Sequence, residues 1–355
     1  MTPPQPAPGA RPLPSRPPSR AAPKAVGVRI AGTGSALPSR VLTNADLERM
    51  MDTSDEWIVQ RTGIRTRYIA DRAKGESSYS LSATALTLAL ESAGLEAKDL
   101  DLLIVATMTP EMSCPPTACR VLEAIGGPQA GAFDLSGACC GFVFGLNCAH
   151  DLIKSGAYRT VGLVGCDTLS KYMDYSDAGR STAIIFGDGA GAVVLRATDD
   201  TDKGIISQAM HADGGGWKHI YVPECDMDFP CGVAPDPGKL CTVQMNGSQV
   251  FKFAVGTFPE LIQQTLDKAG LTAADVDMFV CHQSNARILQ AARERFGLPE
   301  EKLYVNIDRY GNTVAASVPL CLDELRRGGR VRDGHKVMFV AFGGGLTWGS
   351  SLWQL

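Results

Sequence analysis

The chain has 355 residues, of which 45% are hydrophobic and 20% charged, and its formal net charge is −4. This composition is typical of a soluble globular protein long enough for two domains, and it provides no overall basic field for nucleic acid. No apolar run reaches the roughly 18 residues of a membrane-spanning helix. The eleven cysteines form no CxxC pair and no zinc-like Cys/His cluster. We therefore interpret them as reduced thiols, and we expect a cytoplasmic protein without a metal site.

The amino-terminal segment is rich in proline and contains no acidic residue. Because proline removes amide donors and breaks helices, we predict a disordered tail over residues 1–25. The segment lacks the apolar region of a secretory signal. A plastid-type leader and an over-long start are the alternatives to an inert tail.

The chain repeats itself. "LESAGLEAKDLDLLIVA" begins at Leu90, and the similar "LDKAGLTAADVDMFVCH" begins at Leu266. Each copy predicts a helix that ends at Ala-Gly, a short turn and an apolar strand. Weaker echoes at similar spacing join "TVGLVGCDT" to "KVMFVAFGG", "AVGVRIAGTGS" to "DKGIISQAMHA", and "DLSG" to "DRYG". We predict two duplicated halves, 26–200 and 201–355, built on parallel or mixed sheets buried on both faces.

The two halves differ where chemistry is expected. At the end of the repeated strand, the first copy has Ala106 and the second has His282. At the next junction, the first copy has Cys139 and the second has Asn312. A cysteine from one half would then meet a histidine and an asparagine from the other across a pseudo-twofold axis.

Cys139 stands between a predicted strand, "AFDLS", and a predicted buried helix that ends before Gly156. The positive end of a helix dipole favours the thiolate, but by at most roughly 1.5 pKa units. A partner is needed to complete the activation of the thiol, and His282 is the candidate. The neighbouring Cys140 leaves open, from the residues alone, which thiol is the nucleophile.

Other polar and glycine-rich motifs have competing interpretations. His282 ends an apolar strand, where side chains emerge into a cleft, whereas we interpret the other four histidines as exposed or helix-surface residues. Asn312 is either part of the site, a turn residue or a helix N-cap. "FGDGAG" and "AFGGGLTWG" lack the context of a dinucleotide fingerprint. We expect Gly343–Gly345 to bring backbone amides to a reacting oxyanion instead.

Taken in order, a set of motifs resembles the β-ketoacyl-[acyl-carrier-protein] synthase III family of the thiolase superfamily. The set comprises "GTGSALP", "TSDEWIVQRTGIRTRYIA", "GACCGF", "IIFGDGAGAVVL", "HADG", "HQSNARI", "DRYGNTVAASVP" and "AFGGGLTWGS". The resemblance runs from about Val26 to the carboxyl terminus. It implies a homodimeric α/β protein with a thiolase-like five-layer αβαβα fold of two pseudo-symmetric halves.

The resemblance also assigns residues. Cys139 is the nucleophile, His282 and Asn312 complete a triad, and Gly344 donates an oxyanion amide beside that of Cys139 itself. Cys140 falls where the family has a small residue, so we interpret it as packing. Matching positions that hold coenzyme A and its pantetheine arm are Trp57, Arg61, Arg180, Gly247 and Asn285. Matching basic positions that face the acyl carrier protein (ACP) are Lys252, Arg287 and Arg295.

The implied chemistry needs no metal or redox cofactor. Acyl-CoA would acylate Cys139, and decarboxylation of malonyl-ACP would drive a Claisen condensation that initiates fatty acid synthesis. A paralogue from specialised metabolism, with a longer primer or a different acceptor, is the nearest alternative. A non-catalytic acyl-CoA or carrier-protein binding module and a nicotinamide oxidoreductase are the others.

Three features depart from the family pattern. Cys114 stands where the family often has a phenylalanine that crosses the dimer interface and closes the primer pocket, so we expect a deeper pocket that accepts longer or branched primers. The loop 217–240 looks longer than usual, and we expect it to shape the entrance. Glu294 replaces a frequently basic carrier-facing residue.

Overall fold

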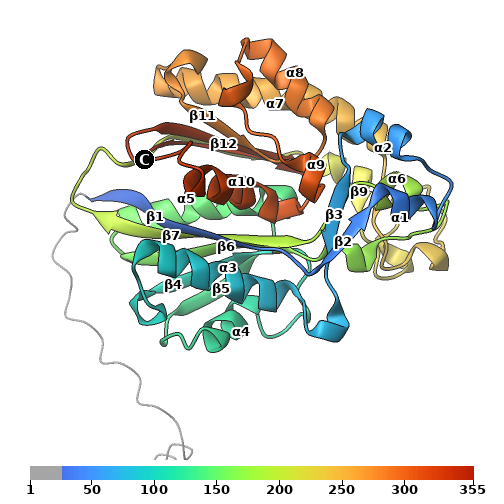
Figure 1. Ribbon diagram of the computed structural model, residues 1–355, viewed down its shortest axis with the longest axis horizontal. Coiled ribbons are helices and arrows are strands. Elements are labelled where there is room, and N and C mark those ends of the chain that lie inside the picture. The colour runs from blue at the N-terminus through green and yellow to red at the C-terminus, as the bar shows by residue number, and fades with distance from the viewer. Residues whose placement is uncertain (1–25) are drawn as a thin grey trace, which may run out of the picture.

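The computed structural model describes residues 26–355, so the predicted tail over residues 1–25 lies outside the described residues. Two β-sheets form the centre of the molecule (Figure 1). The first has the strand order β1 (Gly27–Ala36), β7 (Gly189–Thr198), β6 (Thr160–Asp167), β4 (Leu102–Ala106) and β5 (Gly131–Leu135). The second has the order β11 (Met278–Cys281), β12 (Lys336–Gly343), β13 (Thr347–Gln354) and β8 (Gly204–Ala212).

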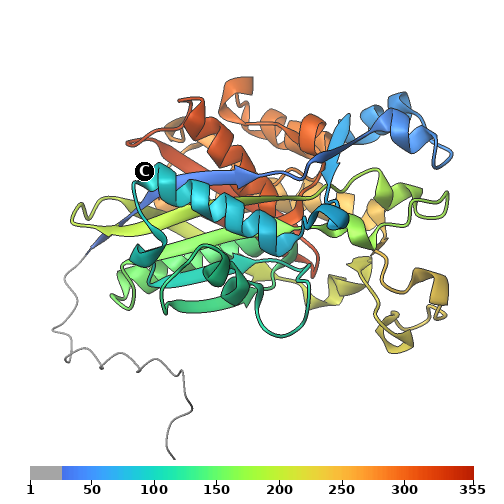
Figure 2. The same cartoon turned by 60° about the horizontal axis from the view of Figure 1, so that its bottom comes forward.

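Helices cover both sheets and fill the space between them. The middle layer contains α5 (Gly141–Lys154) and α10 (Ser317–Arg327), each in contact with strands of both sheets. The outer layers are α3 (Ser78–Ala93) with α4 (Thr117–Ala124), and α7 (Gly247–Ala269) with α8 (Ala286–Phe296). Figure 1 shows these layers stacked in the order helix, sheet, helix, sheet, helix, and Figure 2 shows α3 lying along the first sheet. The predicted five-layer αβαβα fold is confirmed.

Smaller elements gather at one end of the layers (Figure 1). They are β2 (Arg40–Thr43), β3 (Thr66–Ile69), β9 (Ile220–Tyr221), β10 (Gln244–Met245), α1 (Asn44–Glu48), α2 (Asp55–Thr62), α6 (Arg180–Ala183) and α9 (Ile307–Tyr310). Two pairs among them, β2 with β3 and β9 with β10, are antiparallel.

The sheets are mixed, as expected for apolar strands buried on both faces. β4 runs parallel to β5 and β6, while β7 is antiparallel to β1 and β6. In the second sheet, β11 is parallel to β12, and β13 is antiparallel to β12 and β8. Every residue of β4, β6 and β11 is buried, which explains why their sequences are apolar apart from Thr160 and Asp167 at the two ends of β6.

The strongest predicted repeat has the same local structure in both copies. α3 ends at Gly94 (φ 64°) and α7 ends at Gly270 (φ 65°), the left-handed conformation that glycine adopts without a Cβ clash. β4 and β11 follow. The "DLSG" and "DRYG" echoes differ locally, because Asp134 lies in β5 and Asp308 in α9. The division at residue 200 stays our proposal. It is supported by the sheets, because every strand of the first sheet precedes residue 200 and every strand of the second follows it.

One histidine departs from its interpretation. His150 is buried, because α5 lies between the two sheets and leaves no solvent face at this position. Its Nε2 accepts the backbone N–H of Ile205, 3.1 Å away on β8. His150 is therefore a packing residue that joins the middle helix to the second sheet.

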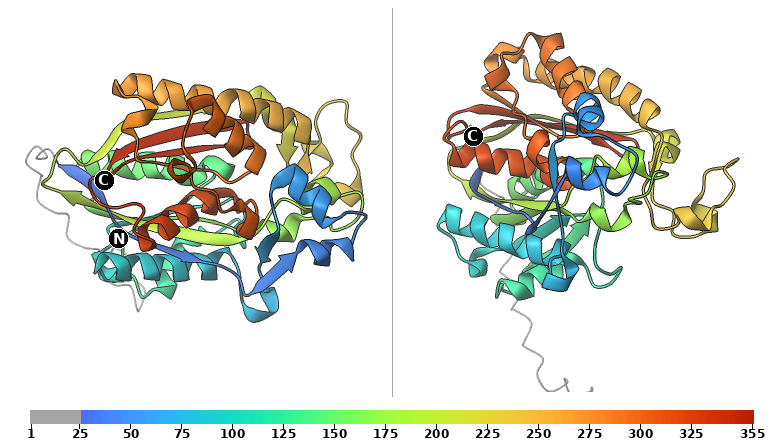
Figure 3. Two further views of the ribbon diagram at one scale, coloured as in Figure 1. Left: turned by 45° about the horizontal axis from the view of Figure 1, so that its top comes forward. Right: turned by 45° about the vertical axis from the view of Figure 1, so that its right-hand side comes forward.

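The segment between β9 and β10 projects from the body of the molecule (Figure 3, right, yellow). It contains only single-turn helices, at Asp226–Asp228 and Pro237–Lys239, and the side chain of Met227 is 91% exposed. A search of the described residues finds no helix that is both long and apolar enough to cross a membrane.

Candidate active site

One cavity of about 480 Å³ is lined by residues from both halves of the chain. It is lined by Cys139 from the first half and by His282, Asn312 and Gly344 from the second. The polypeptide reaches it at the ends of strands, since His282 follows β11 and Gly344 follows β12. The predicted convergence of these four residues is therefore present in the geometry.

Cys139 lies in a single 3₁₀ turn, Ala138–Cys140, immediately before α5, and only 6% of it is exposed. Ala138 has φ 46°, a conformation that non-glycine residues rarely adopt. The turn packs against Gly343, where an added Cβ would lie 2.7 Å from Cys139 Cβ and 3.2 Å from its Sγ. Only glycine at 343 leaves room for the thiol in this position.

The environment of Cys139 holds the thiol protonated. Burial raises the pKa of Cys139 well above its usual value, and the nearby Cys140 and Asp167 add to the rise. The backbone N–H groups of Cys139 and Gly344 act in the opposite direction on the same pKa, because both can donate to a thiolate sulfur. The loss of solvent outweighs the helix-dipole effect considered from sequence.

Cys140 is separated from the cavity. It is completely buried and lies beside Thr347 and Gly349, and burial raises its pKa to about 12. Of the two adjacent cysteines, Cys139 lines the cavity and Cys140 does not. This geometry supports the interpretation of Cys140 as a packing residue.

His282 is 1% exposed, and burial lowers its pKa to about 3, so the imidazole is neutral at physiological pH. Its Nδ1 lies 2.6 Å from Ser317 Oγ, whereas that oxygen lies 3.1 Å from the carbonyl of Val314. The Val314 carbonyl already accepts the backbone N–H of Ser317. The one hydroxyl hydrogen of Ser317 can go either to the Val314 carbonyl or to Nδ1 of His282. In the second arrangement Nε2 of His282 carries the ring hydrogen.

Asn312 lies on a short connection that precedes α10. Its Oδ1 accepts the backbone N–H of Val314 at 2.9 Å, and its backbone N–H donates to Ile185 O. Because Oδ1 is engaged, the Nδ2 amide is the group left to donate elsewhere. With the ring hydrogen on Nε2, the side chains of His282 and Asn312 thus offer two neutral N–H donors at one cavity.

The predicted coenzyme A positions form the outer part of the site. Trp57, Arg61, Gly247 and Asn285 line the cavity, whereas Arg180 does not. The guanidinium carbons of Arg61 and Arg180 lie 4.6 and 5.1 Å from the centre of the Trp57 ring. An aromatic ring flanked by arginines suits a flat, phosphate-bearing ligand.

Asn285 fixes part of this outer region. It caps α8, donates from Nδ2 to Arg61 O at 2.9 Å, and accepts the N–H of Arg287 at Oδ1 at 2.9 Å. One side chain therefore ties α8 to the helix that carries Trp57.

The three predicted carrier-facing cations do not lie together. Arg287 lines the cavity, with its guanidinium carbon 5.1 Å from the Phe251 ring, and the adjacent Lys252 is exposed on α7. Arg295 lines a different groove, between α7 and α8, together with Lys268. Cys114 is exposed in the connection between β4 and α4 and does not line the cavity in the single chain.

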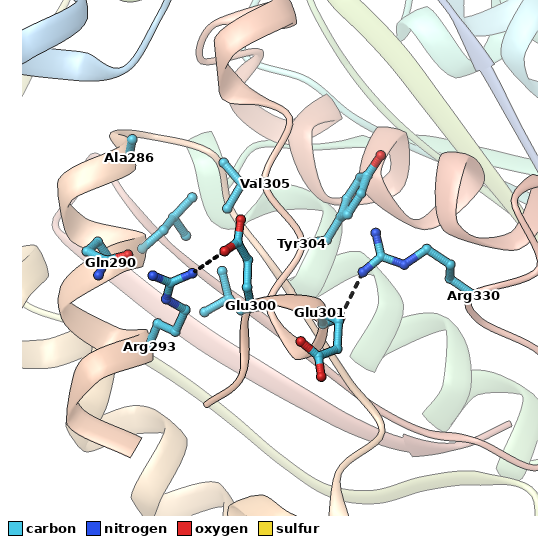
Figure 4. Close-up of a pocket in the computed structure, with 10 residues that line it drawn as sticks. Ala286, Gln290, Arg293, Glu300, Glu301, Tyr304, Val305 and Arg330 are labelled. Atoms are coloured by element: carbon cyan, nitrogen blue, oxygen red, sulfur yellow. Dashed lines mark hydrogen bonds and ion pairs between the residues drawn. The ribbon is translucent and has the colours of Figure 1, made fainter. Parts of the chain in front are cut away.

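A larger hollow of about 670 Å³ borders another face of α8 (Figure 4). Its arginines are already engaged: Arg293 pairs with Glu300 at 3.4 Å, and Arg330 donates to the backbone oxygen of Glu301 at 2.8 Å. Neither a cysteine nor a histidine lines it. Size alone therefore does not mark the reactive site.

Sequence reasoning missed two residues that contact the site's framework. Ser317, which touches His282, is five positions after Asn312, and nothing in its local sequence distinguishes it. Asp167 ends β6 and is completely buried. A carboxylate at the end of a continuous apolar strand was a signal that could have identified it.

The five-layer fold (Figure 1), with a buried cysteine just before the middle helix α5, is the thiolase fold. Models of the 3-oxoacyl-[acyl-carrier-protein] synthase III family match residues 133–214, and those of its C-terminal part match residues 266–355. The chain is 46% identical over 327 residues to a β-ketoacyl-[acyl-carrier-protein] synthase III of Caldanaerobacter subterraneus subsp. tengcongensis, which covers 92% of this chain and 97% of that protein.

Solved structures agree. The 3-oxoacyl-[acyl-carrier-protein] synthase III of Aquifex aeolicus superposes with a TM-score of 0.84 at 39% identity, covering 93% of this chain and all of the other. A priming β-ketosynthase from a polyketide biosynthetic pathway gives a TM-score of 0.85 at 35% identity, covering 95% and 98%. The chain belongs to the β-ketoacyl-[acyl-carrier-protein] synthase III family, and it is an acyltransferase-type condensing enzyme.

Proposed function

We propose that this protein initiates fatty acid synthesis by joining an acyl group from acyl-CoA to malonyl-ACP, with release of CO₂ and formation of 3-oxoacyl-ACP. The single observation that carries the proposal is the convergence of Cys139, His282, Asn312 and Gly344 on one cavity. We also expect the protein to be cytoplasmic.

In the first half-reaction, the sulfur of Cys139 attacks the carbonyl carbon of acyl-CoA. The bond between that carbon and the CoA sulfur breaks, and CoA leaves as a thiol with the proton that Cys139 gives up. The backbone amides of Cys139 and Gly344 lie at the sulfur, where they can stabilise the developing oxyanion. Removal of one such donor typically costs about 10²–10³ in rate.

In the second half-reaction, malonyl-ACP loses CO₂, and the electron pair of the broken C–C bond forms a thioester enolate. Nε2–H of His282 and the Nδ2 amide of Asn312 donate to the enolate oxygen. The enolate carbon attacks the carbonyl carbon of the acyl-cysteine, the bond from that carbon to the Cys139 sulfur breaks, and the thiolate takes up one proton from solvent. The low pKa of His282 supports this role, because it keeps the ring neutral, and a neutral imidazole donates a hydrogen bond without giving up its proton. No step needs a resident metal or cofactor.

The mouth of the cavity suits an acidic carrier. Arg287 lines the cavity and packs on the ring of Phe251, the residue before the exposed Lys252, so we expect these two cations to attract an acidic carrier to a chain whose net charge is −4. Arg295, in the groove between α7 and α8, would make a second contact point. The exposed Glu294, which precedes Arg295, would weaken docking relative to a basic residue.

We propose a homodimer formed along β5. Among residues 26–355 this strand pairs with β4 alone and is an edge of the first sheet, and its Phe133 is 39% exposed. An uncovered edge with an exposed aromatic residue favours pairing with a second chain. Cys114, exposed nearby in sequence, would then reach the partner's primer pocket and leave it deep enough for longer or branched primers.

The first test is mass spectrometry of the intact protein after mixing with acyl-CoAs of increasing length. An acyl adduct that maps to Cys139, is lost in Cys139→Ser and is retained in Cys140→Ser is expected. An adduct on Cys140 would overturn the assignment. No adduct with any acyl-CoA would favour a binding module instead.

The second test compares acceptors for the acyl-enzyme. We expect condensation with malonyl-ACP and little with malonyl-CoA. The similarity to a priming β-ketosynthase of a polyketide pathway keeps one alternative in view. Preference for an acceptor other than malonyl-ACP would place the chain with enzymes of specialised metabolism.

A further inference from the structure

Asp167 is a buried carboxylate that the proposed mechanism does not use. It ends β6, and its side chain is fully enclosed. Oδ1 accepts the backbone N–H of Met108 at 2.9 Å and the hydroxyls of Thr109 and Thr107 at 3.1 and 3.3 Å. Oδ2 accepts the backbone N–H of Ala315 at 3.2 Å. The carboxylate therefore joins the end of β4 to the connection that carries Asn312.

That connection contains a disfavoured backbone conformation. Val314 has φ 53°, which a β-branched residue adopts only under constraint. The amides on both sides of its Cα are held: the N–H of Val314 by Asn312 Oδ1, and the N–H of Ala315 by Asp167 Oδ2. Within the described part of the chain, Asp167 is the one side chain from outside the segment 312–317 that accepts a backbone N–H of this turn, so loss of its bond would weaken the hold on the positive φ of Val314.

Relaxation of this turn would displace both N–H donors of the second half-reaction. Asn312 is oriented by its bond to the N–H of Val314, and His282 is oriented by Ser317, which lies three residues after Val314. Cys139 belongs to a different turn, which contacts Val314–Ala316, but its two flanking amides come from Cys139 and Gly344 and not from that segment. The negative charge of Asp167 raises the pKa of Cys139, so removal of that charge does not hinder thiolate formation. Release of the turn would therefore affect the enolate donors more than the oxyanion donors.

We propose that Asp167 is a positioning residue that holds the turn 312–317 in its disfavoured conformation and so aims Asn312 and His282 at the enolate. The inference rests on the proposed function, because it concerns the malonyl half-reaction. Asp167 touches neither substrate; it acts through the N–H of Ala315.

The test is Asp167→Asn, with the two half-reactions measured separately. An amide has one acceptor oxygen, so among four donors at least one N–H must face the new NH₂ group. Decarboxylation of malonyl-ACP by preformed acyl-enzyme should fall by about 10-fold or more. Rapid-quench mass spectrometry should show acylation of Cys139 no slower than about half the wild-type rate, because loss of the Asp167 charge lowers the pKa of the thiol. Asp323→Asn is the matched control.

Asp323 is also a buried carboxylate, on α10 six residues after Ser317. Its partners are the hydroxyls of Thr33 and Ser35 and the guanidinium of Arg327, and none of them is a backbone N–H of the turn 312–317. Both half-reactions should survive in Asp323→Asn within about twofold. Loss of decarboxylation in this control equal to that in Asp167→Asn would overturn the proposal, because any buried carboxylate would then produce the effect.

Rescue distinguishes positioning from general destabilisation. Glycine adopts positive φ without steric cost, so Val314→Gly combined with Asp167→Asn should recover at least about threefold of the lost decarboxylation. A double variant no better than Asp167→Asn would contradict the role of Val314. Equal losses in both half-reactions of Asp167→Asn would mean a structural effect only.

A second perturbation covers the case in which Asp167→Asn does not fold. A backbone ester at position 315, introduced with lactic acid by nonsense suppression, deletes the N–H that Asp167 accepts and leaves the carboxylate its three other donors. The same selective loss of decarboxylation is expected. If wild type performs both half-reactions and the ester protein keeps full decarboxylation, the role of Asp167 is refuted and the proposed function stands. If wild type performs neither, the proposed function fails and the inference with it.

Discussion

The burial of His282 makes the stability of the fold depend on pH by an amount that follows from its pKa. Burial lowers that pKa from 6.5 to about 3, so the folded protein holds a neutral ring while the unfolded chain takes up a proton below its own pKa. The contribution of His282 to stability is therefore fully present above pH 6.5, and it is lost as the pH falls towards about 3. At about pH 5 the loss is about 2 kcal/mol, from 1.5 pH units at 1.36 kcal/mol each.

Urea unfolding of wild type and of His282→Asn at about pH 7.5 and about pH 5 measures this contribution. Other groups titrate in both proteins, so the fall in unfolding free energy between the two pH values should be about 2 kcal/mol smaller in the variant. Protein concentrations are matched, because any oligomer adds its own dependence. Equal falls in both proteins would refute the neutral buried imidazole and, with it, the proposed donor role. Absence of a His282 titration between about pH 5 and pH 8 in nuclear magnetic resonance is the direct check.

Three further predictions concern the cavity. Gly343→Ala would place a Cβ 2.7 Å from Cys139 Cβ, so acylation measured by intact mass should fall by about 10² or more. The control Gly214→Ala, where an added Cβ meets nothing within 4 Å, should not change acylation. Normal acylation of Gly343→Ala would contradict the packing argument. Trp57→Ala should raise the KM for acyl-CoA by about 10-fold with little change in kcat, because the ring contributes uniform binding; a fall in kcat alone would argue against a coenzyme A contact. Cys114→Phe should narrow the primer range towards acetyl-CoA in competition assays, and turnover of wild type confined to acetyl-CoA would remove the deep-pocket hypothesis.

Several features of the fold could be predicted from local sequence because their causes are local. Continuous apolar runs predicted strands such as β4 and β11, which are buried on both faces. Glycine at the end of an apolar helix predicted the left-handed caps at Gly94 and Gly270. The break in symmetry between copies, Ala106 against His282, indicated where polar side chains would gather.

Other features depend on which distant residues surround a side chain, and the local sequence does not reveal those neighbours. Cys139 and Cys140 are adjacent and chemically identical, yet only Cys139 lines the cavity, because consecutive side chains of the turn point in different directions. The exposed position expected for His150 was wrong, since the second sheet covers its helix from a distant part of the chain.

The protonation states were likewise decided by tertiary structure. Sequence suggested a helix dipole that lowers the pKa of Cys139, but burial by both halves raises it. Asp167 meets Ala315 only because β6 ends beside a turn 148 residues later, and Val314 keeps its unusual φ only in that setting. Sequence by itself therefore determined the strands, the caps and the candidate residues, whereas burial and long-range hydrogen bonds decided which thiol can react and what holds its partners in place.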